Sequence, residues 1–457
     1  MKRRGAALWL ILFAVYAGTL GMRAFGDSQY AGDEPHYLLT AKSIVDDGSI
    51  DLTDEYRTRA YSSFYPRPLV PHGLLSRGRL NEPHGIGLPL LIAPAFAIGG
   101  AKGVEVLLAA IAALAVLLAY RLALRVVPDP WALGATLAVG LSPPMLAYST
   151  AVYPELPAAA ALCGAALLTL RLAERPTRRD AYAAFALIAL LPWFDPRYLL
   201  PGAVVAFYGF RTLRRARRPV LAVTSLEVVG FSAALYVGIS EALYGGPTPD
   251  SAALAGESGF DASFPSGYLE RAYRLVALLI DRDYGMVRWA PVLALALLGV
   301  LVLWRERRSG LARAIPGLRV GEAAALVCAG AALAQLFVAV FLTPTMFGFW
   351  FPGLHLVTAL PLAVPLVALG LRRAPRVGTV LALLGVAASA WLYAEVRLGD
   401  AGLVMRLPDA PWGPLERALP LFSEGSTYPF VLAAALAAAG AALLALDLRR
   451  SQPRAGA

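Results

Sequence analysis

Two adjacent carboxylates open the polar part of the chain. Asp33 and Glu34 are followed by Pro35 and His36, shortly after the first long apolar segment, residues 6–25. A carboxylate beside a substrate can act as a general base on an acceptor hydroxyl, the role it plays when a sugar is displaced from a leaving group. A structural role is also open, because Asp33 could cap a helix by accepting backbone N–H bonds next to proline.

A second group of residues could bind the donor in such a displacement. A lipid-phosphate donor leaves as an anion, so the site needs cations to stabilise the developing charge, and arginine favours bidentate contact with phosphate. Histidine could donate to phosphate or sugar, and tyrosine could stack on a sugar. Each arginine could equally be an interfacial side chain reaching toward lipid headgroups. The candidates for binding donor phosphate or sugar are Arg197, Arg282, Arg288, His84, His355, Glu155 and Tyr153.

The polar residues do not assign a metal. Asp33, His36 and another histidine leave a divalent metal open as a cofactor, but no ligand spacing demands one. Cys163 and Cys328 both fall within predicted helices, where a thiol packs as a small apolar group. We therefore predict neither a disulfide nor a cysteine metal site.

The composition identifies the scaffold that must position these residues. The 457 residues are 58% hydrophobic and 16% charged, with a mean hydropathy of +0.60. A water-soluble domain of this length does not have that balance, which is typical of a multi-pass membrane protein. Apolar stretches near the length of a membrane span recur about twelve times: 6–25, 103–120, 131–147, 156–172, 181–194, 199–212, 219–243, 286–304, 322–342, 355–371, 377–394 and 428–446.

The basic residues predict an orientation. With the N-terminus inside and twelve crossings, most of the 41 Lys and Arg residues fall in cytoplasmic loops and most of the 31 acids fall outside. Both termini are then cytoplasmic, and no nucleic-acid partner is needed to explain the net charge of +10. All four histidines fall on the outer side. A transporter should instead carry ionisable groups near the middle of the membrane, so the one-sided polarity favours a surface-facing active site.

The outer side holds three longer loops within one membrane-embedded domain, residues 1–457. Loop 26–85 contains a predicted amphipathic helix that lies in the interface, with Tyr37, Leu38 and Ala41 on its apolar side and Thr40 among the residues of its polar side. An apolar run after this loop stops at Gly99-Gly100 and is too short to span alone. The other two outer loops are 244–285 and 397–428.

Several motifs resemble those of the GT-C superfamily of membrane glycosyltransferases. The resemblance is nearest to bacterial family 39 enzymes similar to protein O-mannosyltransferases and aminoarabinose transferases, and only its first motif is specific. The chain departs from these relatives at Gly353-Leu354-His355, where they often carry an arginine and an aromatic residue after a glycine. The matching runs, in order, are Gly32-Asp33-Glu34-Pro35-His36-Tyr37, residues 84–91, Tyr153-Pro154-Glu155, residues 281–291 and residues 347–361.

This resemblance implies an all-helical GT-C-like bundle with outer juxtamembrane helices in the cell (inner) membrane. It implies a catalytic role for Asp33, with Glu34 beside it, and an inverting transfer of a sugar from a polyprenyl-phosphate donor to a lipid, glycan or protein acceptor outside the membrane. Two alternatives remain at this stage: a flippase for lipid-linked sugars and a noncatalytic subunit of envelope assembly.

Overall fold

A computed structural model describes most of the chain. The described residues are 2–76, 78–252, 269–308, 316–343, 350–399, 401–404, 419–422 and isolated positions between 431 and 442. Most of loop 397–428, most of the predicted span 428–446, residues 253–268 of loop 244–285, and residues 347–349 lie outside the described part. Within that part the chain is overwhelmingly helical, and its one sheet is a two-stranded antiparallel hairpin.

The helices follow one another with short connections. The α-helices are α1 (Lys2–Ala17), α2 (Glu34–Asp46), α3 (Thr53–Thr58), α4 (Gly87–Ala123), α5 (Trp131–Gly140), α6 (Pro143–Tyr148), α7 (Glu155–Glu174), α8 (Arg178–Ala189), α9 (Leu191–Phe194), α10 (Leu199–Arg215), α11 (Pro219–Tyr244), α12 (Arg274–Ile280), α13 (Met286–Trp289), α14 (Ala294–Arg308), α15 (Pro316–Phe337), α16 (Ala359–Arg373) and α17 (Pro375–Leu398). The strands are β1 (Leu75–Ser76) and β2 (Arg79–Leu80). Single turns include η1 (Ala60–Ser63), η2 (Pro196–Tyr198), η3 (Pro249–Ala252), η4 (Leu269–Tyr273), η5 (Pro291–Leu293), the π-turn η7 (Val338–Leu342) and η8 (Leu354–Leu356).

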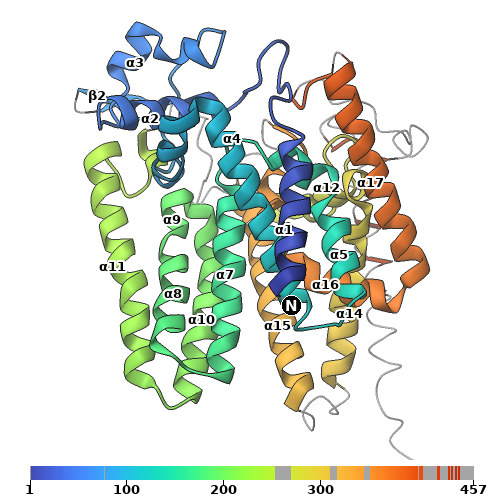
Figure 1. Ribbon diagram of the computed structural model, residues 1–457. Helices are drawn as coiled ribbons and strands as arrows, with labels where there is room; N and C mark the ends of the chain where they lie inside the picture. The colour runs from blue at the N-terminus through green and yellow to red at the C-terminus, as the bar shows by residue number, and fades with distance from the viewer. Residues whose placement is uncertain are drawn as a thin grey trace, which may run out of the picture.

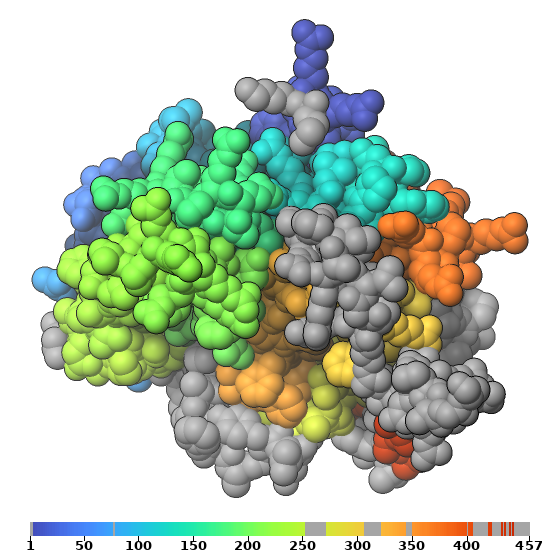
Figure 2. Space-filling view, turned by 90° about the horizontal axis from the view of Figure 1, so that it is seen from below, coloured from blue at the N-terminus to red at the C-terminus, as the bar shows by residue number. Residues whose placement is uncertain are grey.

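The long helices run side by side, and the loop that carries the carboxylates covers one end of the bundle (Figure 1). At that end lie α2, α3, β2 and the first part of α4. The arginine-rich connections from α7 to α8 and from α10 to α11 lie at the opposite end (Figure 1). Seen from below, α7 to α11 form one side of the molecule and α17 lies on the other (Figure 2).

Five described helices are long and apolar enough to cross a membrane: Gly87–Ala123, Glu155–Glu174, Pro219–Ser251, Gly321–Leu342 and Pro375–Leu398. Two predicted spans are broken instead. The stretch 131–147 is divided at Ser142-Pro143 into α5 and α6, and 181–194 is divided before Pro192 into α8 and α9. Proline cannot donate the backbone hydrogen bond that would continue the helix. The multi-pass architecture is therefore supported, without a count of twelve.

Helix α4 contains the break predicted at Gly99-Gly100. Gly100 has φ of 59° and ψ of −152° inside this helix, a conformation open mainly to glycine. Helix α4 packs against α2, α7 and α16, and its first part lies at the end of the bundle where α2 lies (Figure 1). The apolar run before Gly100 is thus a helical segment distinct from the longer one that follows it, as its length indicated.

Helix α2 is more buried than an interfacial helix should be. Thr40 and Ser43 on its expected polar side are 7% and 0% exposed, whereas Val45 on the apolar side is 37% exposed. The reason is that loop 52–84 folds over the helix, so that Leu39 packs with Leu52 and Tyr61. Helix α2 is consequently held between this loop and α4.

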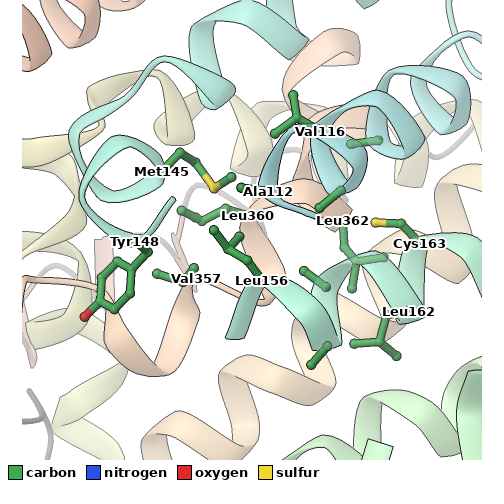
Figure 3. Close-up of a cluster of buried hydrophobic side chains, with 14 of the residues drawn as sticks. Ala112, Val116, Met145, Tyr148, Leu156, Leu162, Cys163, Val357, Leu360 and Leu362 are labelled. Atoms are coloured by element: carbon green, nitrogen blue, oxygen red, sulfur yellow. The ribbon is translucent and has the colours of Figure 1, made fainter. Parts of the chain in front are cut away.

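The core beneath the loop joins helices far apart in sequence. Ala112 and Val116 of α4, Met145 of α6 and Leu156 of α7 pack with the start of α16 (Figure 3). Tyr148 lies at the edge of this cluster, and its hydroxyl donates to the backbone carbonyl of Phe351 at 2.5 Å. The core therefore positions the segments around Tyr148 and Phe351, which lie close to the site described below.

Candidate active site

The two adjacent acids have opposite surroundings. Glu34 is 1% exposed, and its carboxylate accepts from the backbone N–H of Ala31 at 2.9 Å, the backbone N–H of Val152 at 2.9 Å and the Trp350 indole N–H at 3.0 Å. Burial raises the pKa of Glu34 to about 8, while these three donors act against the rise. Both oxygens are engaged, so Glu34 joins the loop to two distant segments.

Asp33 is the accessible acid of the pair. It occupies the N-cap position of α2, but its side chain makes no capping hydrogen bond, so the capping role suggested by the sequence is absent. Its carboxylate side chain is 39% exposed and lies 3.6 Å from His72 Nδ1 and 3.8 Å from His84 Nε2. One carboxylate oxygen thus faces two imidazoles while the side chain stays partly open to solvent.

Tyr153 supports the backbone beneath Asp33. Its hydroxyl accepts from the Asp33 N–H at 3.3 Å. Gly32 has φ of +59°, and a Cβ there would lie 2.5 Å from the same hydroxyl, so a larger residue would clash as well as being strained. The Trp350 ring packs against Tyr148 and Tyr153, with ring centroids 4.8 and 5.7 Å apart. An aromatic wall therefore stands behind the acidic pair.

A second buried acid lies on the other side of the histidines. Glu82 Oε1 is 3.1 Å from His36 Nδ1, and the side chains are only 3% and 2% exposed. Although burial favours the neutral acid, the hydrogen bond and charge of His36 lower the pKa of Glu82 to about 2. Burial and the charges of His36 and His84 lower the pKa of His72 to about 4. Three histidines and two acids are therefore grouped in one loop.

Arg197 lies at the centre of a buried polar group next to this site. It is 7% exposed, with Nε 2.9 Å from Asp195 and a terminal nitrogen 3.4 Å from Glu155. The other terminal nitrogen is 3.2 Å from His355 Nδ1. The side chain is fixed because Asp195 Oδ1 also accepts from the Arg197 N–H at 2.8 Å, which forms the turn η2.

Tyr37 lies between the two groups. Its ring centroid is 5.1 Å from that of His84 and 6.4 Å from that of Tyr153. Burial, then the charges of Asp33, Asp195 and Glu155, raise the pKa of Tyr37. The two polar groups are thus electrostatic neighbours.

Two glycines let the His84 segment approach α9. A Cβ on Gly85 would lie 2.5 Å from the Trp193 carbonyl oxygen, and one on Gly87 would lie 2.6 Å from the same atom. Both distances are below any normal contact. The two backbones therefore approach more closely than any residue with a Cβ would allow, and this sets His84 beside the turn that carries Arg197.

The predicted site residues fall into three groups. Asp33, Glu34, Tyr153 and His84 meet around the start of α2, and Glu155, Arg197 and His355 meet around η2. Arg282 and Arg288 instead contact the region of α12 and α13: the Arg282 side chain donates to the Leu419 carbonyl at 3.3 Å, and Arg288 donates to the Arg282 carbonyl at 2.6 Å.

Sequence reasoning left out Glu82, His72 and Asp195. One signal was available for the first, because the tripeptide Glu-Pro-His occurs twice, at residues 34–36 and 82–84. Asp195 is one of the polar residues in the turn after α9. His72 stands in a proline-rich stretch without any pattern that would place it beside Asp33.

An apolar groove begins next to η2. It has a volume of 350 Å³ and runs between α8, α9, α10 and α11. Leu191, Pro192 and Leu199, which flank Asp195 and Arg197 in sequence, line one part of it, and Phe207 and Leu226 line another. Its walls are almost entirely hydrocarbon, so it suits an apolar chain.

Comparison with known proteins places the fold. No family model matches the chain, and no curated protein matches its sequence. The structure is similar to that of ArnT from Cupriavidus metallidurans in the apo state, with a TM-score of 0.50 and 13% identity over 85% of this chain and 65% of ArnT. This likeness confirms, at the level of the fold, the resemblance seen in the sequence motifs. The chain spans slightly less than two thirds of the length of ArnT.

Two archaeal structures are also similar, with scores too low to carry weight. The oligosaccharyltransferase AglB from Archaeoglobus fulgidus, in complex with an inhibitory peptide and a dolichol-phosphate, has a TM-score of 0.46 and 16% identity over 89% of this chain and 57% of AglB. The apo oligosaccharyltransferase from the same organism has a TM-score of 0.43 and 15% identity over 87% of this chain and 55% of the other.

Proposed function

We propose that this protein is a glycosyltransferase that moves a sugar from a polyprenyl-phosphate donor to an acceptor, with inversion, at the extracytoplasmic face of the cell membrane. The observation that carries the proposal is the division of labour between the two acids. Glu34 is fixed by three donors, whereas Asp33 is partly exposed, makes no capping bond and faces the imidazoles of His72 and His84.

Asp33 acts as the general base. It accepts the proton of the acceptor hydroxyl while the hydroxyl oxygen forms a bond to C1 of the sugar. The bond from C1 to the phosphate oxygen breaks in the same displacement, and the lipid phosphate leaves as an anion. A single displacement of this kind inverts the configuration at C1.

The Arg197–His355 pair receives the leaving phosphate. Arg197 already lies within 3.4 Å of two acids, Glu155 and Asp195, so its charge is partly balanced before any donor binds. Its contact with His355 Nδ1 at 3.2 Å orients that imidazole. We therefore assign phosphate contact to the pair rather than to the arginine alone.

The lipid part of the donor occupies the groove between α8 and α11. The groove begins at the residues that flank Arg197, so a phosphate at η2 would direct its hydrocarbon chain into it. The arginine-rich connections lie at the far end of the bundle (Figure 1), which by the positive-inside rule favours an extracytoplasmic position for Asp33.

A reconstituted transfer assay tests the function. Purified protein in liposomes would receive a radiolabelled polyprenyl-phosphate sugar and membranes from a deletion strain as the acceptor source. We expect release of free polyprenyl phosphate and transfer of label to an acceptor. Transbilayer movement of intact donor without transfer would indicate a flippase, and binding without turnover would indicate an assembly subunit; either result would contradict the proposal.

A further inference from the structure

The group of His36, His72 and Glu82 has the composition of a transition-metal site. The three side chains each offer one ligand atom, and these atoms lie within 4.8 Å of one another. Two imidazoles and a carboxylate form one of the ligand sets that zinc takes in proteins, with a fourth position left open. Magnesium and calcium prefer oxygen ligands instead.

The distances fit such an ion. Zinc bound tetrahedrally at about 2.0–2.2 Å keeps its ligand atoms about 3.3 Å apart. His36 Nδ1 and Glu82 Oε1 are 3.1 Å apart, close to that separation. The ring of His72 lies close to that of His36, with centroids 3.9 Å apart and an angle of 35° between the ring planes, so its nitrogen is within 4.8 Å of the other two ligand atoms.

The surroundings orient the ligands and leave a way in. The second oxygen of Glu82 accepts from the backbone N–H of His72 at 3.1 Å, which fixes the carboxylate. The Tyr56 hydroxyl contacts both Glu82 Oε1 and His36 Nδ1, the latter at 2.7 Å, and thereby bridges the two atoms that an ion would join. His36 and Glu82 are buried, but the side chain of His72 is 28% exposed.

We propose that His36, His72 and Glu82 bind one divalent transition ion of the zinc class, adjacent to Asp33 but without using it as a ligand. The ion links the start of α2 to the returning segment of the same loop, and so fixes the position of Asp33, three residues before His36. The inference does not depend on sugar transfer, and its test contains no donor or acceptor.

A competing ligand set must be separated by the experiment. Asp33, His72 and His84 also place one ligand atom each within 4.8 Å of one another, and they share His72 with the proposed set. We assign the ion to the proposed set because His36 and Glu82 are buried and closer together, whereas Asp33 is 39% exposed.

Zinc binding to the purified full-length protein, carrying an affinity tag without histidines, decides between the sets. We expect one zinc per chain by mass spectrometric metal analysis. In a competition titration with a zinc chelator, His72→Gln and Glu82→Gln should weaken the affinity by about 10–100-fold. Asp33→Asn and His84→Gln should change it by less than twofold, and Tyr56→Phe should retain zinc because no ligand is removed.

Two results would overturn the proposal. Zinc affinity equal to the wild type in both His72→Gln and Glu82→Gln would show that the group is only a hydrogen-bonded network. Loss of zinc in Asp33→Asn with retention in Glu82→Gln would assign the ion to the competing set. His72 is partly exposed, so we expect His72→Gln to fold even if Glu82→Gln does not. Loss of zinc in His72→Gln with retention in Asp33→Asn and His84→Gln would then still assign the ion to the proposed set.

Discussion

Replacing Glu34 by glutamine tests whether this acid stabilises the fold or takes part in the reaction. The carboxylate accepts three N–H groups from Ala31, Val152 and Trp350. An amide keeps one acceptor oxygen and replaces the other with an NH₂ donor. If the oxygen stays with Ala31 and Trp350, the NH₂ group faces the Val152 N–H, so two donors oppose each other in a buried site.

The expected cost follows from these bonds. When two donors face each other in a buried site, one or both are left without an acceptor, and each such donor costs about 1–3 kcal/mol. We therefore expect Glu34→Gln to destabilise the protein by about 2–3 kcal/mol. With an unfolding entropy of about 2.1 cal/mol/K per residue, this corresponds to a decrease in Tm of about 2–3 °C for a chain of 457 residues.

Thermal unfolding in detergent, followed by far-ultraviolet circular dichroism, measures the effect. The matched control is Asp33→Asn, the same chemical change at the neighbouring exposed acid, which should change stability by less than about 0.5 kcal/mol. Trp350→Phe removes one of the three donors and should lower Tm by a smaller amount. A Glu34→Gln protein with wild-type Tm and no transfer activity would refute the structural role and assign chemistry to Glu34.

Three further perturbations test the arrangement around this pair. Gly85→Ala should lower both Tm and the transfer rate, because its Cβ would overlap the Trp193 carbonyl. Gly99→Ala should leave both unchanged, because no atom lies within 4 Å of its Cβ. Equal effects of the two substitutions on thermal unfolding and transfer rate would contradict the close approach. Arg197→Lys should raise the KM for the donor at least about tenfold, because lysine lacks the planar guanidinium that binds phosphate through two nitrogens. Arg57→Lys, in the exposed ion pair with Asp54, should not change this KM. An unchanged KM in Arg197→Lys would show that the arginine does not bind the donor. Ala203 is an exposed residue that lines the apolar groove, so Ala203→Trp fills the groove. It should raise the KM for a long-chain donor more than the KM for a short-chain analogue. Equal changes in KM for both chain lengths would show that the lipid binds elsewhere.

The sequence predicts the architecture better than the details of the site. Hydrophobic spacing indicated a multi-pass bundle, and Gly99-Gly100 predicted the break in α4, because glycine tolerates a backbone that other residues avoid. Pro143 and Pro192 are also visible in the sequence. The apolar stretches around them nevertheless have about the length of a membrane span, and this length favoured the prediction of uninterrupted helices. The structure shows that these prolines divide two predicted spans.

The roles of the two acids could not be assigned from their neighbours in sequence. Glu34 is buried by Val152 and Trp350, which are 118 and 316 residues away. Only the folded bundle brings these donors to it, and their absence around Asp33 leaves that acid open. The same limitation applies to His72, whose place beside Asp33 depends on the fold of loop 52–84 over α2.

The most direct test of the account is the transfer rate of Asp33→Asn against Asp54→Asn, an exposed acid in the same loop whose side chain is 74% exposed. Removing a general base typically lowers a rate by about 10²–10⁴-fold, so we predict a loss of at least about 100-fold for Asp33→Asn, with wild-type Tm, and an unchanged rate for Asp54→Asn. A fully active Asp33→Asn protein would contradict the central claim that this carboxylate accepts the proton of the acceptor.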